Sequence, residues 1–124
     1  MPGEELPRRV DKPWGHELWF ALTDRYAGKL LHVKAGQRLS VQYHERKDES
    51  SYLLSGRLLL HRGPNPDELA ATELAAGAVW RNEPRQVHTI EALEDAVVVE
   101  VSTPELDDVV RLTDDYGRAG TAAP

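Results

Sequence analysis

Short stretches in which apolar and polar residues alternate cover most of this chain, and residues typical of turns separate them. The clearest stretch is RLSVQYH (38–44), in which every second residue from Arg38 to His44 is polar and the residues between are apolar. A period of two is typical of a β-strand, because successive side chains point to opposite faces of the sheet. Further strands are predicted at 16–22, 29–34, 51–62 (two strands joined at Ser55-Gly56), 69–74, 78–93 (two strands around a proline loop), 96–102 and 106–118.

This pattern amounts to about eight to ten short strands with turns at roughly ten-residue spacing, which is typical of an all-β sandwich or barrel. No long helical period, internal repeat or domain boundary is visible, so we expect one domain over 1–124. Prolines and charges predict an irregular arm over 1–13 and a frayed tail over 119–124. The β-branched run 96–102 predicts a buried strand, and Gly56 is expected to supply a positive φ in its turn.

Composition narrows the function more by exclusion than by positive evidence. The chain has 124 residues and no cysteine, which excludes disulfides and thiolate metal sites. It shows no apolar leader and no apolar run of membrane-spanning length, so we expect a soluble, cytoplasmic protein that does not bind membranes. Fifteen basic against 21 acidic residues give a net charge of −6, with the basic residues scattered, which argues against nucleic acid. A phosphorylated small molecule remains open as a partner, because two or three local cations suffice for a phosphate.

Four side chains form a candidate metal site. Gln42 and His44 share one face of a predicted strand, and Glu49 follows a charged loop at the start of the next strand, which we expect to pair with the first. A distant strand offers His88 as the remaining ligand. Imidazole nitrogen, carboxylate and amide oxygen suit a borderline divalent cation where no thiolate is present. The alternative is a three-ligand His–Glu–His site in which Gln42 binds substrate.

The spacing from Gly36 to Gly56, G-x5-Q-x-H-x4-E-x6-G, resembles the first cupin motif, with Gln42 in place of the usual first histidine. The segment GAVWRNEPRQVH (77–88) resembles the second cupin motif, with Arg85 where the family has a glycine. This resemblance implies a cupin jelly-roll barrel, also called a double-stranded β-helix, which agrees with the predicted strand number.

A narrower resemblance covers nearly the whole chain. The segments KPWGHE (12–17), 25–44, SYLLSG (51–56) and DDVVRLTDDYGR (107–118) are similar to the cupin domain of type II phosphomannose isomerases. The resemblance implies interconversion of mannose 6-phosphate and fructose 6-phosphate with a divalent metal ion. It implies zinc as the expected ion, with manganese, iron, cobalt or nickel as alternatives, and the following ligands: Gln42, His44, Glu49 and His88.

The same resemblance suggests roles for other residues. Lys47 stands where the family's loop carries an arginine, and Glu17 follows the PWG segment that lies near the family's site, so both are assigned to catalysis. Arg118, in the final YGR, is assigned to catalysis and substrate binding. Lys29 is a second cation for the phosphate or the enediolate charge, and Ser40, on the same strand face as the ligands, is assigned to substrate binding.

The chain also departs from the family pattern. Ser50 and Ser51 stand where the family has His-Trp after the glutamate, and Thr89 replaces an arginine-like residue. Two alternatives therefore stand beside the isomerase: another metal-dependent cupin enzyme such as an iron dioxygenase, or a non-catalytic sugar-binding cupin module. We further expect a homodimer that pairs through edge strands.

Overall fold

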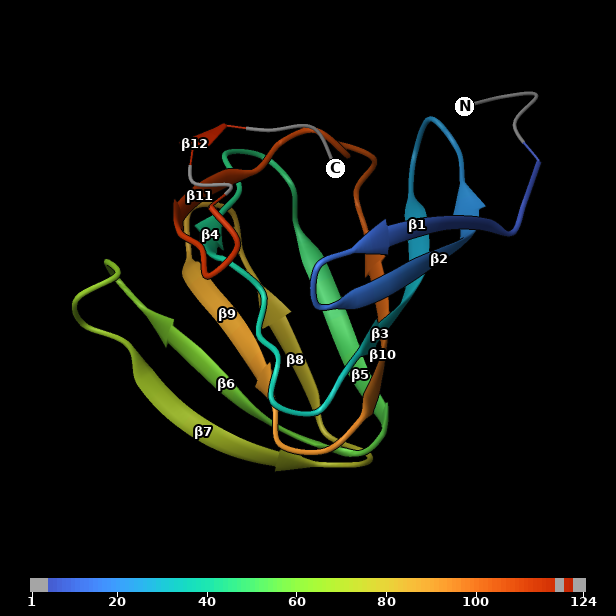
Figure 1. Ribbon diagram of the computed structural model, residues 1–124. Helices are drawn as coiled ribbons and strands as arrows, with labels where there is room; N and C mark the ends of the chain where they lie inside the picture. The colour runs from blue at the N-terminus through green and yellow to red at the C-terminus, as the bar shows by residue number, and fades with distance from the viewer. Residues whose placement is uncertain (1–4, 118–119, 122–124) are drawn as a thin grey trace.

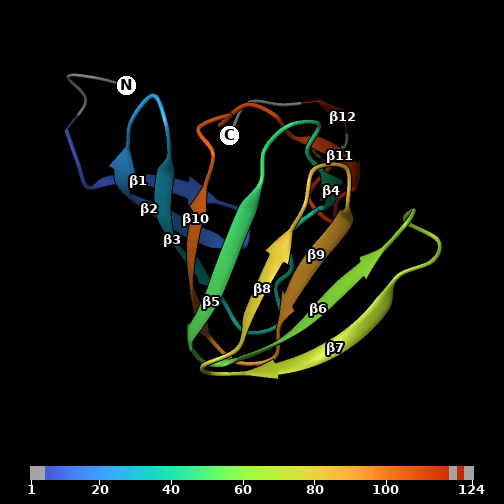
Figure 2. The same cartoon turned by 180° about the vertical axis from the view of Figure 1, so that it is seen from behind.

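The computed structural model describes residues 5–117 and 120–121, which form two antiparallel β-sheets packed face to face (Figures 1 and 2). Sheet A contains, in spatial order, β1 (Arg8–Lys12), β2 (Gly15–Leu22), β3 (Ala27–Val33), β10 (Ala96–Ser102), β5 (Glu49–Ser55) and β8 (Val79–Asn82). Sheet B contains, in spatial order, β12 (Gly120–Thr121), β11 (Val110–Thr113), β4 (Val41–Tyr43), β9 (Val87–Ala92), β6 (Arg57–Gly63) and β7 (Ala70–Ala75). The prediction of an all-β jelly roll is confirmed.

From β3 onward the chain passes from one sheet to the other at every connection except the hairpins β6–β7 and β11–β12. Strands that follow one another in sequence therefore face each other across the barrel, and strands distant in sequence become neighbours. In particular, β4 lies between β9 and β11 in sheet B, whereas β5 lies between β10 and β8 in sheet A. The expected antiparallel pairing of β4 with β5 is wrong.

The chain ends also differ from expectation. Arg8–Lys12 of the predicted irregular arm forms β1, because its residues pair in register with β2 from Trp19 to Gly15. Within the predicted strand 38–44 only Val41–Tyr43 is a regular strand. Of the predicted frayed tail, only Gly120–Thr121 lies among the described residues, and it forms β12. None of the described residues belongs to a helix long and apolar enough to cross a membrane.

The core occupies the space between the sheets. Trp14 and Trp80 belong to one large buried cluster together with residues of both sheets, whereas Trp19 packs in a small separate cluster with Ala27 and Leu106. All three tryptophans are buried. Burial of these large rings supplies much of the hydrophobic stabilisation, at roughly 25 cal/mol per Å² of apolar surface.

Strand β10 is buried on only one face. Its inward residues, among them Val98 and Glu100, are buried, but Val101 on the other face is 51% exposed. The β-branched run therefore does not mark a strand covered on both sides within this chain, and it includes a charged inward residue. The exposed face of β10 is open to solvent, and Glu100 brings a charged group into the barrel.

The turn between β5 and β6 depends on Gly56, which has the expected positive φ of 87°. A Cβ at this position would lie 2.8 Å from Ala96 Cα and would overlap the Asp95 carbonyl oxygen. We expect Gly56→Ala to lower the free energy of unfolding by about 2 kcal/mol or more in urea titrations. Gly36→Ala is the matched control, since Gly36 has a φ of 80° but nothing within 4 Å of an added Cβ. Equal losses in the two variants would contradict a contribution from the overlap.

Candidate metal centre

Inward-facing positions change from apolar to polar toward one end of the barrel, the end where β4 and β11 lie (Figure 1). On β10 the inward side chains run from Val98 to Glu100, and on β5 they run from Leu53 back to Glu49. Strand β9 shows the same change in sheet B. Buried polar groups require partners or a ligand, so this end of the barrel is where a site is expected.

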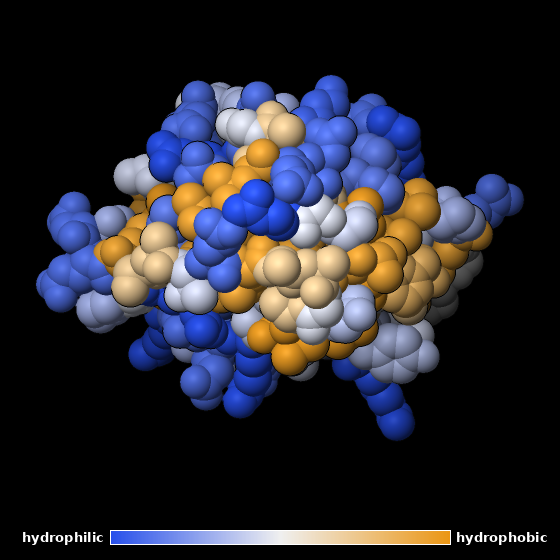
Figure 3. Space-filling view, turned by 90° about the horizontal axis from the view of Figure 1, so that it is seen from below, coloured by the Kyte–Doolittle hydropathy of each residue, from blue (hydrophilic) through white to orange (hydrophobic). Residues whose placement is uncertain are grey.

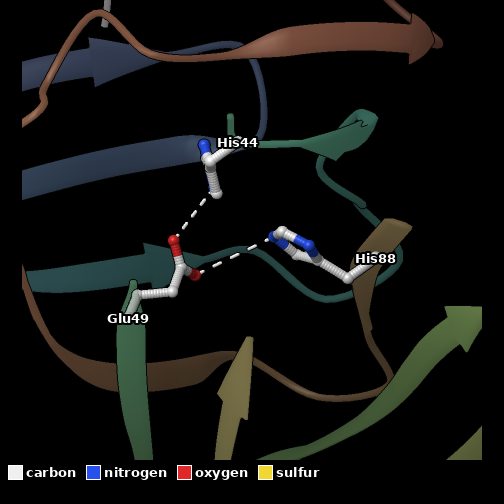
Figure 4. A group of neighbouring side chains, drawn as sticks. All are labelled: His44, Glu49 and His88. Atoms are coloured by element: carbon white, nitrogen blue, oxygen red, sulfur yellow. Dashed lines mark ion pairs between the residues drawn. The ribbon is translucent and has the colours of Figure 1, made fainter. Parts of the chain in front are cut away.

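Three buried side chains from three different segments converge there (Figure 4). His44 follows β4, Glu49 opens β5 and His88 lies on β9. His44 Nε2 lies 3.0 Å from Glu49 Oε1, and His88 Nε2 lies 3.9 Å from Glu49 Oε2. One ligand atom from each residue falls within 4.8 Å of the other two, so the three could hold one metal ion.

Backbone carbonyl groups fix the orientation of both imidazoles. His44 Nδ1 lies 2.6 Å from the carbonyl oxygen of Asp108, and His88 Nδ1 lies 2.8 Å from that of Gln86. A carbonyl oxygen only accepts, so each Nδ1 must carry the proton and each Nε2 presents a lone pair toward Glu49. This is the outer-shell arrangement typical of metal-binding histidines.

The chemistry of the donor atoms fits a divalent cation. His44 Nε2, Glu49 Oε1 and His88 Nε2 are all buried without a hydrogen-bond partner, because the short His44–Glu49 contact lacks hydrogen-bond geometry. Burial alone would raise the pKa of Glu49, but favourable interactions, the largest with the Lys47 ammonium, outweigh it and hold that pKa well below its usual range. Burial lowers the pKa of His88, which favours the neutral imidazole. An ionised carboxylate and a neutral imidazole are the forms that bind metal.

Gln42 lies beside this group. It pairs directly with His88 across β4 and β9, and its Oε1 accepts a hydrogen bond of 2.8 Å from Ser40 Oγ. An amide oxygen has two lone pairs, so this hydrogen bond leaves one for a metal ion, and Gln42 as a fourth ligand stays a prediction beside the His–Glu–His set. Two histidines and one glutamate form a common catalytic zinc set that leaves a coordination position open.

The strand order brings the ligands together in a different way from the arrangement predicted from the sequence. His88 was expected from the far side of the barrel, but its strand is the direct neighbour of β4. Glu49 is the residue that reaches across from the opposite sheet. Arg85, at the glycine position of the second motif, has a positive φ of 69°, and its N–H donates to the His44 carbonyl oxygen at 2.6 Å. This bond links the two ligand-bearing segments.

A network of buried charges adjoins the candidate metal site. Lys29 Nζ lies 3.4 Å from Glu17 Oε1, which also accepts a 2.8 Å hydrogen bond from Trp19 Nε1. Lys47 Nζ lies 3.4 Å from Glu100 Oε2 and 3.5 Å from Glu49 Oε1. Lys29 and Glu100 are direct cross-strand partners on β3 and β10, so their side chains emerge on the same face of sheet A.

The buried charges shift the pKa values of the carboxyl groups in opposite directions. Burial would raise the pKa of Glu17, but Lys29 and Lys12 outweigh it and lower that pKa. Burial and the nearby Glu49 raise the pKa of Glu100, which Lys47 offsets only in part. For Lys47, burial acts to lower the pKa, but the surrounding carboxylates outweigh it and raise that pKa above its ordinary value. Lys47, expected by default to be a solvated loop residue, is instead a buried cation.

Most of the predicted site residues line one cavity of about 50 Å³. Those assigned from the sequence and found there are Glu17, Lys29, Ser40, Gln42, His44, Lys47 and Glu49. His88 lines the adjoining cavity together with Gln42 and Glu49. Arg118 lies outside the described residues.

The sequence reasoning missed three residues of the site. Glu100 interrupts the otherwise apolar start of the run 96–102, and this interruption could have indicated a buried charge. Arg111 lines the cavity and pairs across β11 with Gln42. Asp108 binds the loop between the first two ligands: its carboxylate accepts the backbone N–H groups of 45, 46 and 47 at 2.7–2.9 Å. These contacts join segments more than 50 residues apart, so local patterns do not reveal them.

Asp108 therefore positions both the loop and the His44 ring. Asp108→Ala keeps the backbone carbonyl that orients the His44 ring but removes the carboxylate that holds the 45–47 loop, so we expect zinc binding to weaken by about 10-fold in calorimetric titrations, the lower end of the cost of losing an outer-shell contact. Asp108→Asn, which retains one acceptor oxygen, should recover part of the affinity. The neighbouring exposed Asp107 supplies the control, and Asp107→Ala should leave affinity unchanged. Unaltered affinity in Asp108→Ala would show that the loop holds its conformation without this carboxylate.

The sequence of this chain matches the family described as mannose-6-phosphate isomerase C-terminal over residues 3–114. The chain belongs to this family. It is also 31% identical over 114 residues to the xanthan biosynthesis protein XanB of Xanthomonas campestris pv. campestris (strain B100), a match that covers 90% of this chain and 24% of XanB. The chain thus spans about a quarter of the length of that relative.

Solved structures with a cupin fold resemble this member of the mannose-6-phosphate isomerase C-terminal family in fold. An RmlC-like cupin from Shewanella frigidimarina superposes with a TM-score of 0.71 at 15% identity, covering 83% of this chain and 88% of that protein. Oxalate decarboxylase from Bacillus subtilis superposes with a TM-score of 0.73 at 15% identity, covering 92% and 32%. These likenesses confirm the predicted cupin fold.

Proposed function

We propose that this protein is a metal-dependent isomerase that interconverts the aldose and ketose forms of a sugar phosphate, with mannose 6-phosphate and fructose 6-phosphate as the first pair to test. One observation carries the proposal: buried, unpartnered ligand atoms of His44 and Glu49 face the same cavity as the cations Lys29 and Lys47. The family match and the place of XanB in xanthan biosynthesis, by its name, support a sugar substrate.

His44, Glu49 and His88 would hold the metal ion, with zinc as the expected one. A bound divalent cation would supply Lewis-acid polarisation of the sugar carbonyl. The ligands are oriented for it, because each Nδ1 is held by a backbone carbonyl, each Nε2 faces Glu49, and the lowered pKa of Glu49 favours its ionised form. Burial excludes bulk water, which strengthens the electrostatic interactions within the cavity.

The remaining charged residues would bind substrate and move the proton. Lys29 and Arg111 supply positive charge for the phosphate or for the developing enediolate. Glu17, ionised and oriented by Trp19, takes the proton from the sugar C2 and returns it to C1, while the hydroxyl proton passes from O2 to O1 through the carboxyl group of Glu100. Glu100, whose raised pKa favours the protonated form, can donate a hydrogen bond to a substrate oxygen.

The test uses the full chain, loaded separately with zinc, manganese and cobalt. Conversion of mannose 6-phosphate to fructose 6-phosphate is followed by a coupled assay, and exchange of the C2 proton in deuterated water is followed by NMR. His44→Ala and Glu17→Gln should each abolish exchange, while His61→Ala, on the outer face of sheet B, should not. Tight metal binding with neither turnover nor exchange on any hexose or pentose phosphate would overturn the proposal.

Two other functions fit specific observations. The same His–Glu–His set suits ferrous iron with open coordination positions, so iron in the isolated protein together with oxygen uptake would favour an iron-dependent cupin enzyme. Ser50 and Ser51, which stand where the family has His-Trp, favour a sugar-binding module without turnover. Sugar binding without any C2 exchange would identify that case.

A further inference from the structure

The outer face of sheet A carries an uninterrupted apolar row. The strand register aligns one outward-facing residue from each of five adjacent strands: Leu18, Leu30, Val99, Tyr52 and Val79. An antiparallel sheet with one face in water normally presents polar residues on that face. This row therefore indicates a sheet covered on both sides, although the chain itself covers only one.

The exposure of this face is large. Val79 is 71% exposed, Leu54 53%, Val101 51%, Phe20 45% and Tyr52 43%. Together with the half-buried residues of the row, these exposed fractions correspond to roughly 500 Å² of apolar surface, at the upper end of what a monomer presents. Apolar residues also reach the surface in a broad band when the molecule is seen from below (Figure 3).

The outer face of sheet B provides the contrast. Its equivalent row runs across β9, β6 and β7 through Glu91, Leu59 and Glu73. Glu73 forms an ion pair with the exposed Arg57, and Arg38, whose backbone forms a β-bridge with that of Glu91 at the edge of the row, forms an ion pair with Asp115. One outer face of the barrel is thus charged and solvated, and the other is apolar. The apolar face is a particular property of sheet A.

We infer that the outer face of sheet A is the interface of a homodimer. A standard interface buries about 800 Å² per partner, of which rather more than half is apolar, and the apolar area of this face supplies that share. The two copies would therefore meet through a sheet face, and not through the edge strands expected from the sequence. This inference is independent of the proposed activity.

The shape of the face favours a second copy as its occupant. At one side the Phe20 ring lies against Gly28, where a Cβ would come within 2.7 Å of Phe20 Cζ, and the ring is 45% exposed. At the other side β5 and β8 border a shallow hollow of about 450 Å³, lined by Tyr52, Val79 and Val101 among others. A two-fold axis can run parallel to the strands, in the interface beside the central β10. Rotation about this axis places β2 of one copy against β5 and β8 of the other. Each Phe20 then meets the partner's hollow, as an isologous interface of aligned sheets requires.

The first experiment measures the mass of the full chain in solution by light scattering and sedimentation equilibrium. The wild-type protein should have twice the chain mass of 13.9 kDa. Val79→Lys and Tyr52→Glu each place a charge in the proposed interface and should weaken dimerisation by about 100-fold or more. Ala71→Lys, an exposed position on the outer face of sheet B, is the matched control and should remain dimeric. Circular dichroism checks that each variant is folded.

The second experiment locates the interface. Because the chain has no cysteine, Val99→Cys and Ala71→Cys each introduce a single thiol. Aligned sheets pack about 10 Å apart, so a short bis-maleimide should cross-link Val99→Cys to itself and leave Ala71→Cys uncross-linked. A wild-type protein that stays monomeric up to about 0.1 mM would overturn the inference, because interfaces of this size bind in the micromolar range or tighter. A dimer that survives both charge variants, or a larger assembly, would overturn it as well.

Discussion

Replacing Glu49 with alanine is expected to remove high-affinity binding of zinc and other divalent ions. Glu49 is the one anionic ligand of the candidate site and the one that reaches it from sheet A, while both histidines come from the sheet B side. Its loss leaves two neutral imidazoles without a countercharge. Loss of an outer-shell partner costs up to about 100-fold in metal affinity, and Glu49 is a direct ligand, so we expect the zinc affinity to fall by more than this.

Calorimetry and the metal-dependent shift in melting temperature measure this effect together. A ligand present at 100 times its dissociation constant stabilises the folded state by about 2.7 kcal/mol, so the wild-type melting temperature should rise with zinc and fall on adding EDTA. The Glu49→Ala protein should show neither change. Glu45→Ala removes the same charge from an exposed position in the same loop and should behave as wild type. Zinc affinity that persists in Glu49→Ala would exclude the His–Glu–His site.

Replacing Lys47 with methionine should produce the largest loss of stability among charge substitutions of the site. Lys47 is 4% exposed and lies between Glu49 and Glu100. Methionine preserves most of the buried volume but leaves two buried carboxyl groups facing each other without a cation. Breaking a buried ion pair by removing one partner costs about 3–5 kcal/mol, and we expect a loss at the lower end because Glu100 can take up a proton.

Urea unfolding of the metal-free protein measures the loss. Arg57→Met serves as the control, because Arg57 forms only exposed ion pairs, which solvent and salt screen, so little stability should be lost. Adding Glu100→Gln to Lys47→Met should recover part of the stability, since it removes one of the two unpaired carboxyl groups. A Lys47→Met protein as stable as wild type would mean that Lys47 contributes no net stabilising charge.

The sequence predicted most of the local structure. Alternation and turn residues located the central strands to within a few residues, and Gly56 was placed in its left-handed turn. The irregular arm was wrong for Arg8–Lys12, because the pairing that makes β1 a strand is supplied by β2 and not by its own residues. The prediction for β10 was incomplete for a similar reason: β-branched residues indicate a strand, but they do not say whether neighbours cover both of its faces.

The sequence predicted which residues form the candidate site better than it predicted how they meet. The spacing of His44 and Glu49 and the distant His88 are visible in the sequence, and these three do converge. Lys47 and Glu100 were not predicted to meet, because Lys47 lies in a loop and Glu100 lies on a strand 53 residues later in the sequence. A one-residue slip in the register of β10 would turn Glu100 to solvent. Asp108 lies in a loop whose contacts are all long-range.

Taken alone, the sequence determined the strands, the turns and the identity of the metal-ligand candidates, since these depend on residue type and on spacings within a few positions. The tertiary structure decided which strands are neighbours, which charges are buried together and which apolar face remains uncovered. The physical reason is that a side chain's pKa, its partners and its exposure depend on what packs against it. In this fold the packing partners come from the opposite sheet or from strands tens of residues away.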